Sequence, residues 1–350
     1  MGCIRQGGHG AQNGHPVVEN QFLYRLLVCL DGIFSWSRNL PMKRIIAVLI
    51  LGLLSFALPV TGNAATCSCA GVPLLSAIDT SSTEPGDWRI NFSSEDHVID
   101  DLVLGDKEIK GETRRKRSSL SQAVSATYGI ADGWSISGLI SYIEHSREVG
   151  SGFFGEQTSS GLGDGVILLH YTPRYITLFS RHEISLRIGA RIPINKDDAG
   201  GVIIFSEDMQ PNVGAVGEIL WTSYSYAFNQ AATIQFNASA NYTRNDDEND
   251  RGYAFGDEFN FALGTSQSIG SKFGYSAGLR YRTTDADERN SFEIPNTGGE
   301  WLDFIPAVQY AVTDDLNIAV SGRIPLKRNL DGAVQFSTSY SYALSLTYGF

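Results

Sequence analysis

The stretch that decides the fold is QFSTSYSYALSLTYGF, which runs from Gln335 to Phe350 and ends the chain. From Phe336 onward every second residue is aromatic or apolar, apart from Thr338, and the residues between them are small or polar. Because successive side chains of a strand point to opposite faces, the pattern predicts a strand with one apolar face. Its length exceeds that of most soluble strands but suits a tilted membrane-crossing strand of about 9–11 residues with flanks.

Aromatic residues stand at both ends of this apolar face, where a bilayer has its two interfaces. The chain ends on Phe350. This ending resembles the last strand of bacterial outer-membrane β-barrels, in which a terminal Phe is part of the assembly signal. An ordinary sandwich strand is the alternative for a single alternating segment, so the rest of the chain has to decide between them.

Eleven further segments with strand-like alternation precede this stretch. Their connections are long and short in turn, as in bacterial barrels with long external loops and short periplasmic turns, so both ends of the barrel are expected on the periplasmic side. The predicted ranges are Trp88–Ser94, Leu120–Ile130, Trp134–Ile143, Asp164–Tyr171, Glu183–Pro193, Asn212–Tyr226, Ala232–Tyr242, Phe255–Thr265, Phe273–Arg282, Trp301–Ala311, Leu316–Ile324 and Gln335–Phe350. The sequence does not fix which face of the sixth points inward. The predicted fold is an all-β transmembrane antiparallel barrel of about 12 strands.

A signal for export is predicted near the amino terminus. Met42-Lys43-Arg44 is a basic start, Ile45 to Leu58 is an apolar core, and Gly62-Asn63-Ala64 has the small-x-small pattern of a cleavage site. Cleavage is expected after Ala64 or Ala65. The core is shorter than the roughly 20 residues of a transmembrane helix, which favours a cleaved signal peptide over an anchor.

The chain therefore divides into four parts. Residues 1–41 are interpreted as an extension from a start codon assigned too early, and residues 42–65 as the signal peptide. Residues 66–85 are a short periplasmic lead-in, too small for a plug domain, and residues 86–350 form the barrel. The expected location is the bacterial outer membrane.

The negative net charge argues against nucleic acid as a partner. The formal net charge is −11 at pH 7, and acidic residues gather in predicted loops such as Asp246 to Asp250. A basic nucleic-acid footprint is absent from the sequence. Acidic external loops are compatible with divalent cations that bridge to lipopolysaccharide, although a solvated loop is the plainer interpretation. The expected partners are outer-membrane lipid, lipopolysaccharide and a small-molecule solute.

Two cysteines, Cys67 and Cys69, follow the predicted cleavage site. Ala64 and Thr66 fit a lipoprotein signal poorly, so lipidation of Cys67 is a weak option. A disulfide across C-x-C closes a strained ring. A bridge to a periplasmic partner, a metal site and no role at all stay open beside it.

Three short segments resemble a known family. Ser159-Ser160-Gly161-Leu162-Gly163-Asp164-Gly165 leads into a strand that ends His170-Tyr171, Ala190-Arg191-Ile192-Pro193 ends the next strand, and Gln210-Pro211-Asn212-Val213-Gly214 follows. Over roughly Trp88 to Phe350 the chain resembles outer-membrane transporters associated with the meta-pathway of phenol degradation. It departs from that family at Gly165, where the family usually has an apolar residue. Gly161 and Gly163 are expected to permit a tight loop conformation.

The resemblance implies an outer-membrane channel for small solutes, with aromatic or other hydrophobic compounds as one class, and no cofactor. Two alternatives stay open. One is a structural or partner-sheathing barrel that docks a periplasmic protein through Cys67 and Cys69, and the other is an outer-membrane lipid hydrolase.

Charged residues fall on the inward faces predicted for the strands. The candidate pore-lining residues are Arg187, Arg191, Arg280, Arg282, Arg323, Glu183 and Glu258. Arg191, Arg282 and Arg323 are expected near one height at the outer ends, where a ring of charges biases a pore toward anions. The alternative is that the arginines pair with Glu183, Glu258 or Asp303 across the lumen and brace the wall. Twelve strands enclose less space than the sixteen to eighteen of general porins, so a narrow or loop-closed lumen is expected.

Catalytic patterns are weak in this sequence. His145-Ser146 is its only His–Ser neighbour pair, and no Ser-Asn-Gly follows it. Asp246-Asp247 has no obvious histidine partner for a barrel protease. No catalytic, cofactor or metal site is therefore predicted, and the protein is not expected to be an enzyme.

Overall fold

The computed structural model describes residues 83–110, 115–149, 156–173, 181–195, 199–200, 205–245 and 247–350. The predicted extension, the signal peptide, Cys67, Cys69 and most of the lead-in lie outside these ranges.

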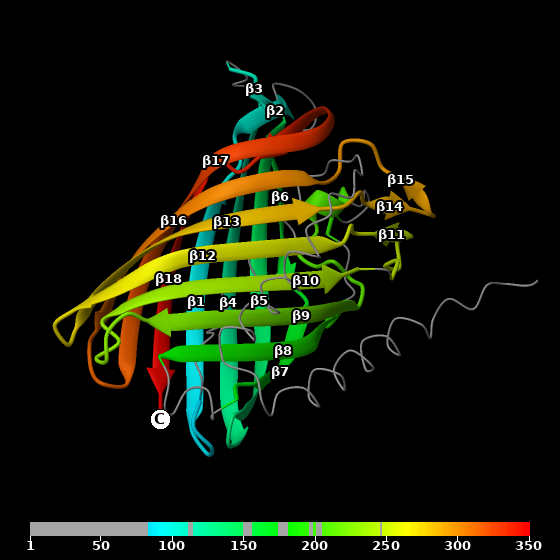
Figure 1. The fold of residues 1–350 in the computed structure, drawn as a ribbon. Coiled ribbons are helices and arrows are strands. Elements are labelled where there is room, and N and C mark those ends of the chain that lie inside the picture. The colour runs from blue at the N-terminus through cyan, green and yellow to red at the C-terminus, as the bar shows by residue number, and fades with distance from the viewer. Residues whose placement is uncertain are drawn as a thin grey trace, which may run out of the picture. The chain divides into compact units, whose positions relative to one another are not determined.

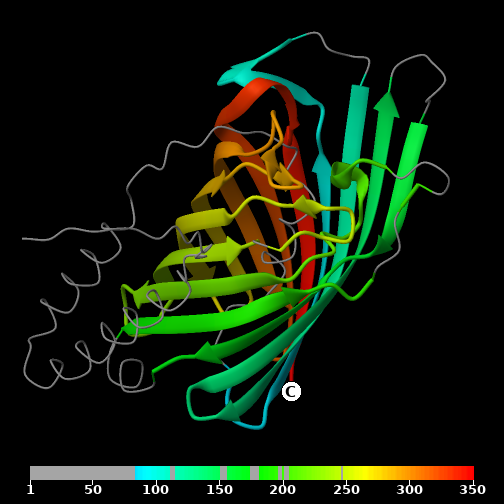
Figure 2. The same ribbon diagram turned by 90° about the vertical axis from the view of Figure 1, so that its right-hand side faces the viewer.

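Twelve antiparallel strands form a closed barrel (Figures 1 and 2). Each strand pairs with the next along the chain, and the last pairs with the first, so the sheet has no open edge toward lipid. The prediction of a twelve-stranded antiparallel barrel is confirmed. The strands are β1 Trp88–Val98, β4 Arg115–Ala131, β5 Trp134–Val149, β7 Gly165–Tyr171, β8 His182–Ile192, β9 Gly217–Ala227, β10 Ile234–Arg244, β12 Glu258–Ile269, β13 Phe273–Thr284, β16 Gly299–Ala311, β17 Leu316–Ser337 and β18 Tyr340–Gly349.

Shorter elements lie in the long connections at one end of the barrel. We call this the outer end, and the end with the short turns the periplasmic end. The short elements are β2 Asp101–Gly105, β3 Lys107–Glu108, β6 Glu156–Leu162, the 3-10 turn η1 Glu207–Met209, β11 Tyr253–Ala254, β14 Glu288–Arg289 and β15 Phe292–Glu293. Strands β11, β14 and β15 form a separate small sheet, and β6 pairs with β5. Within the described residues, no helix has the length and apolar character needed to cross a membrane.

The two faces of the barrel wall follow the predicted alternation. Outward residues such as Ile140, Ile188 and Leu220 are each more than half exposed, as expected for a lipid-facing belt. Their neighbours Leu139, Arg187 and Ile219 point into the lumen and are buried. The sixth barrel strand, whose register the sequence left open, is β9, with Ile219 and Trp221 inward.

Several strands extend further at the outer end than predicted. β1 continues to Val98, and β4 begins at Arg115, although the predicted strands end at Ser94 and begin at Leu120. Charged Glu95 and Arg117 occur there because they point into the lumen, where each is less than 10% exposed. Charged residues are typical of solvent-exposed loops, but in a barrel with a polar lumen they also occur within strands, on the inner face.

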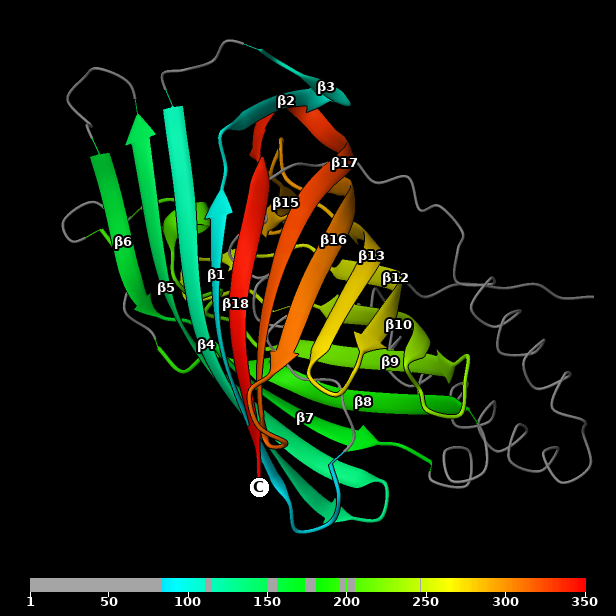
Figure 3. The same ribbon diagram turned by 90° about the vertical axis from the view of Figure 1, so that its left-hand side faces the viewer.

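The stretch Gln335–Phe350 is not one strand, as had been predicted. Gln335 to Ser337 end β17, where they pair with β2, and the chain turns at Thr338 and Ser339 before β18 begins. The turn is held by Arg328, which donates to the carbonyl of Thr338 at 3.2 Å, and by Ser339 N–H, which donates to Val98 at 2.8 Å. Figure 3 shows β2 and β3 lying across the outer end of β17.

From Tyr340 onward the predicted faces are correct. Tyr340, Tyr342, Leu344, Tyr348 and Phe350 are exposed on the outer face, and Ser341 is buried on the inner one. The membrane-crossing part of the quoted stretch therefore has the apolar and polar faces that the sequence predicted.

Deletion of Phe350 is expected to lower the amount of assembled barrel several-fold. Phe350 and Trp88 exchange two backbone hydrogen bonds, of 3.0 and 2.8 Å, at the seam between β18 and β1, and the Phe350 ring stacks on Tyr348. The heat-modifiable band of the outer-membrane fraction on a gel measures assembly, with Phe350→Tyr as the aromatic control. Equal band intensity for the deletion and the native chain would show that the terminal residue is dispensable.

Candidate functional site

The connection between β8 and β9 folds back against the inner wall at the outer end. We call residues 205–216 the inner loop. The carbonyl of Gln210 lies 3.2 Å from Nε2 of His145 on β5, and Ser159 on β6 donates its hydroxyl to the carbonyl of Met209 at 2.5 Å. Met209 and Gln210 are both fully buried.

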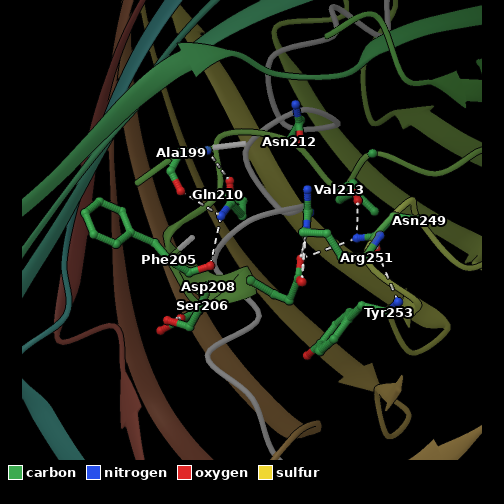
Figure 4. A network of polar contacts seen from close by, with 12 residues as sticks. Ala199, Phe205, Ser206, Asp208, Gln210, Asn212, Val213, Asn249, Arg251 and Tyr253 are labelled. Atoms are coloured by element: carbon green, nitrogen blue, oxygen red, sulfur yellow. Dashed lines mark hydrogen bonds and ion pairs between the residues drawn. The ribbon is translucent and has the colours of Figure 1, made fainter. Parts of the chain in front are cut away.

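The same loop is bound to the other side of the barrel. Asn249, in the connection between β10 and β12, donates to the carbonyl of Val213 at 3.0 Å. Three strands separate β5 from β10 in the sheet order, so the inner loop crosses part of the lumen. Figure 4 shows how the Gln210 side chain turns back to bind the backbone of Ala199 and Phe205, at 2.8 and 2.9 Å. The expectation of an inward loop thus matches the structure.

Two adjacent acids of η1 bind arginines on opposite sides of the barrel. Asp208 forms an ion pair of 2.6 Å with Arg117 on β4 and one of 3.5 Å with Arg147 on β5. Glu207 forms pairs of 2.6 Å with Arg251 and 3.2 Å with Arg289. Ion pairs therefore hold the inner loop from both sides, and we call these four pairs the clamp.

The pKa of Asp208 reflects this clamp. Burial opposes ionisation of its carboxyl group, but Arg117, the hydroxyl of Ser206 and Arg147 outweigh that effect. Together they hold the pKa of Asp208 below its usual value. The inner loop thus carries a charged carboxylate at neutral pH, which keeps the clamp closed.

The three family-like segments meet at one point, the carboxylate of Asp164. It accepts hydrogen bonds from the N–H groups of Val213, at 2.9 Å, and Gly214, at 3.4 Å. It also lies 3.5 Å from Nε of Arg191, and both side chains are at least nine-tenths buried. Asp164 lies in the break between β6 and β7. Its carboxylate faces the inner loop there.

Gly161 and Gly163 are required because neighbouring atoms lie close to their Cα atoms, not because the backbone is left-handed. Neither Gly161 nor Gly163 has a positive φ. A side chain on Gly163 would collide with the hydroxyl of Ser141 and come within 3.3 Å of the Pro211 carbonyl. On Gly161 it would lie 3.0 Å from the Pro211 ring. The expected tight-loop role is thus replaced by a packing role against the inner loop.

Ion pairs on the inner wall involve Arg191, Arg280, Arg282 and Arg323. Arg280 pairs with Asp303 at 2.8 Å, Arg282 with Glu258 at 2.8 Å, and Arg323 with Glu95 at 2.9 Å. Arg191 pairs with Asp164 and also donates to Asn245 at 2.8 Å. Asp303 and Glu258 are acids that the bracing alternative named, but their pairs join adjacent strands rather than cross the lumen. Whether the same arginines also select anions stays a prediction.

The remaining candidates lie on β8. Arg187 is 1% exposed, and its guanidinium sits 4.8 Å from the ring centroid of Trp221 on β9. Glu183 lies four residues before Arg187 on the same face of β8 and is half-buried. Arg282 and Trp301 form a second stack of this kind, at 4.7 Å.

The histidine and serine weighed for catalysis point to opposite faces. His145 is buried and faces the inner loop, whereas Ser146 faces outward and binds Glu156 at 3.2 Å. They cannot share a proton with one substrate. In the described part of the chain, no group of three or more His, Cys, Asp or Glu side chains could hold a metal ion.

Comparison with solved structures shows the same architecture elsewhere. The crystal structure of the COG4313 outer membrane channel from Pseudomonas putida F1 matches with a TM-score of 0.61, over 78% of this chain and 98% of that chain, at 10% sequence identity. The β domain of the Bordetella autotransporter BrkA covers 77% of this chain and 100% of its own, with a TM-score of 0.44 and 12% identity. At 10% identity the likeness to the COG4313 channel shows the barrel fold alone. No protein-family model matches the chain, and no curated protein matches it by sequence.

Proposed function

We propose that this barrel is a passive outer-membrane channel for small solutes. The observation that carries the proposal is the contrast between its two faces. The outer face is an apolar belt, and the inner faces of β1, β4, β5, β7 and β8 carry buried hydroxyl, amide, imidazole or charged groups. A wall that is polar only inside is built to pass solutes or water rather than to fill a core.

The inner loop and the ion pairs suit a channel that admits small molecules one at a time. The clamp of Asp208 and Glu207 narrows the lumen at its outer end, and the arginine pairs line the wall beneath it. Aromatic solutes are part of the proposal, because Trp221 and Ile219 give the inner wall an apolar section. The resemblance to transporters of the phenol-degradation meta-pathway supports the same solute class. The proposed role involves no catalysis.

Planar-bilayer recording tests this proposal. Purified protein, reconstituted at low density, is expected to show discrete conductance steps smaller than those of sixteen-stranded porins. The variant with Asp208→Asn and Glu207→Gln is the comparison, since it weakens the clamp while it keeps the strands. It is expected to conduct more than the native chain. A folded barrel that stays silent in both forms would leave a structural or partner-sheathing role.

A further inference from the structure

The inner wall of the barrel is accessible to water on one side only. On β5 and β7 the inward residues at mid-height are buried, and Ser137 and Leu168 are no more than 2% exposed. On β12, β13, β16, β17 and β18 the inward residues at the same height are partly exposed, as are Gly278, Ile305 and Ser321. We call this second part of the inner surface, at mid-height, the open wall. A solute inside the barrel therefore contacts the open wall rather than β5 or β7.

The open wall is lined by small and uncharged residues. Gly278 on β13 is directly opposite Gly264 on β12 and Ile305 on β16, and Ala307 on β16 is opposite Ser321 on β17. The two neighbouring glycines have no side chains to fill the lumen, and Ile305 beside them supplies an apolar contact. This surface suits the body of a small solute with an apolar part.

The next inward positions toward the outer end are charged. Arg280, Asp303 and Arg323 each lie two residues beyond Gly278, Ile305 and Ser321 on the same three strands. Two strand spacings of about 4.8 Å and two residues of about 3.3 Å place the Cα atoms of Arg280 and Arg323 roughly 12 Å apart. Their long side chains approach each other over this span, and their positive charges repel.

Both arginines have a donor that no protein group uses. Arg280 pairs with Asp303 at 2.8 Å and Arg323 with Glu95 at 2.9 Å, in each case through a terminal nitrogen. Nε of each arginine is buried and has no hydrogen-bond partner among the described residues. The side chain of Arg323 is 9% exposed and that of Arg280 is 13% exposed. Buried donors on charged groups are costly to leave unpaired, so two of them at the edge of the open wall indicate that an acceptor binds there.

We propose that Arg280 and Arg323 bind the carboxylate of a small, singly charged organic acid whose body lies against Gly278 and Ile305. The two oxygens of a planar carboxylate accept hydrogen bonds from the two Nε–H groups, and its charge lowers the repulsion between the guanidinium groups. The inference names a solute class for the proposed channel, and it rests on that channel only for the passage of the acid.

The charges around the site limit the anion to a single negative charge. Three arginines are already matched by three acids on the wall: Arg280 by Asp303, Arg282 by Glu258 and Arg323 by Glu95. A bound carboxylate adds one negative charge to this balanced set, and a dianion adds two. Repulsion from the wall acids is stronger in a narrow, partly dry lumen than in bulk water. Inorganic phosphate and sulfate are therefore expected to bind much more weakly than a carboxylate.

Ligand-detected NMR on the full mature barrel in detergent tests the site without any transport assay. The probe is benzoate at neutral pH, with benzyl alcohol as the uncharged analogue of similar size, and the broadening of their aromatic proton signals measures binding. Benzoate is expected to bind at least ten-fold more tightly than benzyl alcohol, and equimolar phosphate is expected not to displace it. Equal affinity for benzoate and benzyl alcohol would show that no carboxylate site exists.

A variant that keeps the charges separates the site from general electrostatic attraction. Arg280→Lys with Arg323→Lys retains both positive charges for Asp303 and Glu95 but removes both Nε donors. The dissociation constant of benzoate is expected to rise at least ten-fold. The matched control is Arg282→Lys, on the same face of β13, for which a change of less than two-fold is expected. If the double variant forms a heat-modifiable barrel and binds benzoate like the native chain, the proposal is wrong. If it does not assemble, the comparison of benzoate with benzyl alcohol on the native barrel decides.

Planar-bilayer recording gives the functional consequence. Benzoate is expected to lower the chloride current of the native barrel at least two-fold and to leave that of the double lysine variant unchanged. A barrel that binds benzoate but is silent in bilayers would keep the carboxylate site and refute the channel. A barrel that conducts but does not bind benzoate would keep the channel and refute the site.

Discussion

Replacement of Asp164 by alanine is expected to lower the free energy of unfolding of the barrel by roughly 3–5 kcal/mol, the usual cost of breaking a buried ion pair. Arg191 would be left buried opposite an apolar methyl group, and the N–H groups of Val213 and Gly214 would lose their acceptor. The inner loop is then expected to detach on that side and the conductance to rise. Urea unfolding in detergent micelles, followed by tryptophan fluorescence, measures the stability change.

Two matched variants separate the charge from the hydrogen bonds. Asp164→Asn keeps one acceptor for the loop backbone but removes the negative charge, so an intermediate loss is expected. Asp164→Leu combined with Arg191→Met removes both charges and is expected to recover much of the stability while the loop stays released. If alanine at position 164 changes neither stability nor conductance, Asp164 does not anchor the inner loop.

Removal of the lumenal arginines should have the largest effect on ion preference. In the triple variant Arg191→Gln, Arg282→Gln and Arg323→Gln, the carboxylates of Asp164, Glu258 and Glu95 stay on the wall without their partners. Charges in a narrow, partly dry passage act on ions more strongly than charges in bulk water. The reversal potential in a salt gradient is therefore expected to move toward cations.

A charge-balanced control decides whether the arginines select anions or only brace the wall. The six-residue variant that also carries Asp164→Asn, Glu258→Gln and Glu95→Gln keeps the lumen neutral and close in shape. If the arginines select anions, this variant loses an anion preference that the native barrel has. If they only brace the wall, its reversal potential equals the native one and only its stability falls. Equal reversal potentials in all three folded forms would exclude any electrostatic role in selectivity.

Strand alternation predicted the membrane-crossing part of the barrel because lipid imposes it. Each outward position must be apolar, so Tyr340 to Phe350, β8 and β13 had only one consistent register. β9 was ambiguous because Ile219 and Trp221 point inward beside outward Leu220, so both faces carry apolar residues. No lipid-driven rule distinguishes the two faces there.

The outer end of the lumen was harder to predict for a different physical reason. Glu95 and Arg117 were taken for loop residues because charge usually marks solvent, yet both are buried strand residues. Asp164 was noted as part of a Gly-rich turn, but its partners Val213 and Arg191 lie in other segments, and only the closed wall brings them together. The bracing acids Glu258 and Asp303 were predicted, but as partners across the lumen, and the register that puts each beside an arginine on an adjacent strand came only from the structure.

The seam between β1 and β18 has a consequence for how the protein is made. All other barrel pairs join neighbours along the chain, whereas Ser341 donates to Glu95 across 246 residues. Hairpins can form early, but the longest loop closes last and carries the largest entropic cost. Every intermediate before that step is an open sheet with two unsatisfied edges, which makes it a substrate for proteases and a partner for other chains. The time a chain spends unclosed, rather than the strength of any hairpin, then sets how much of it survives to reach the membrane.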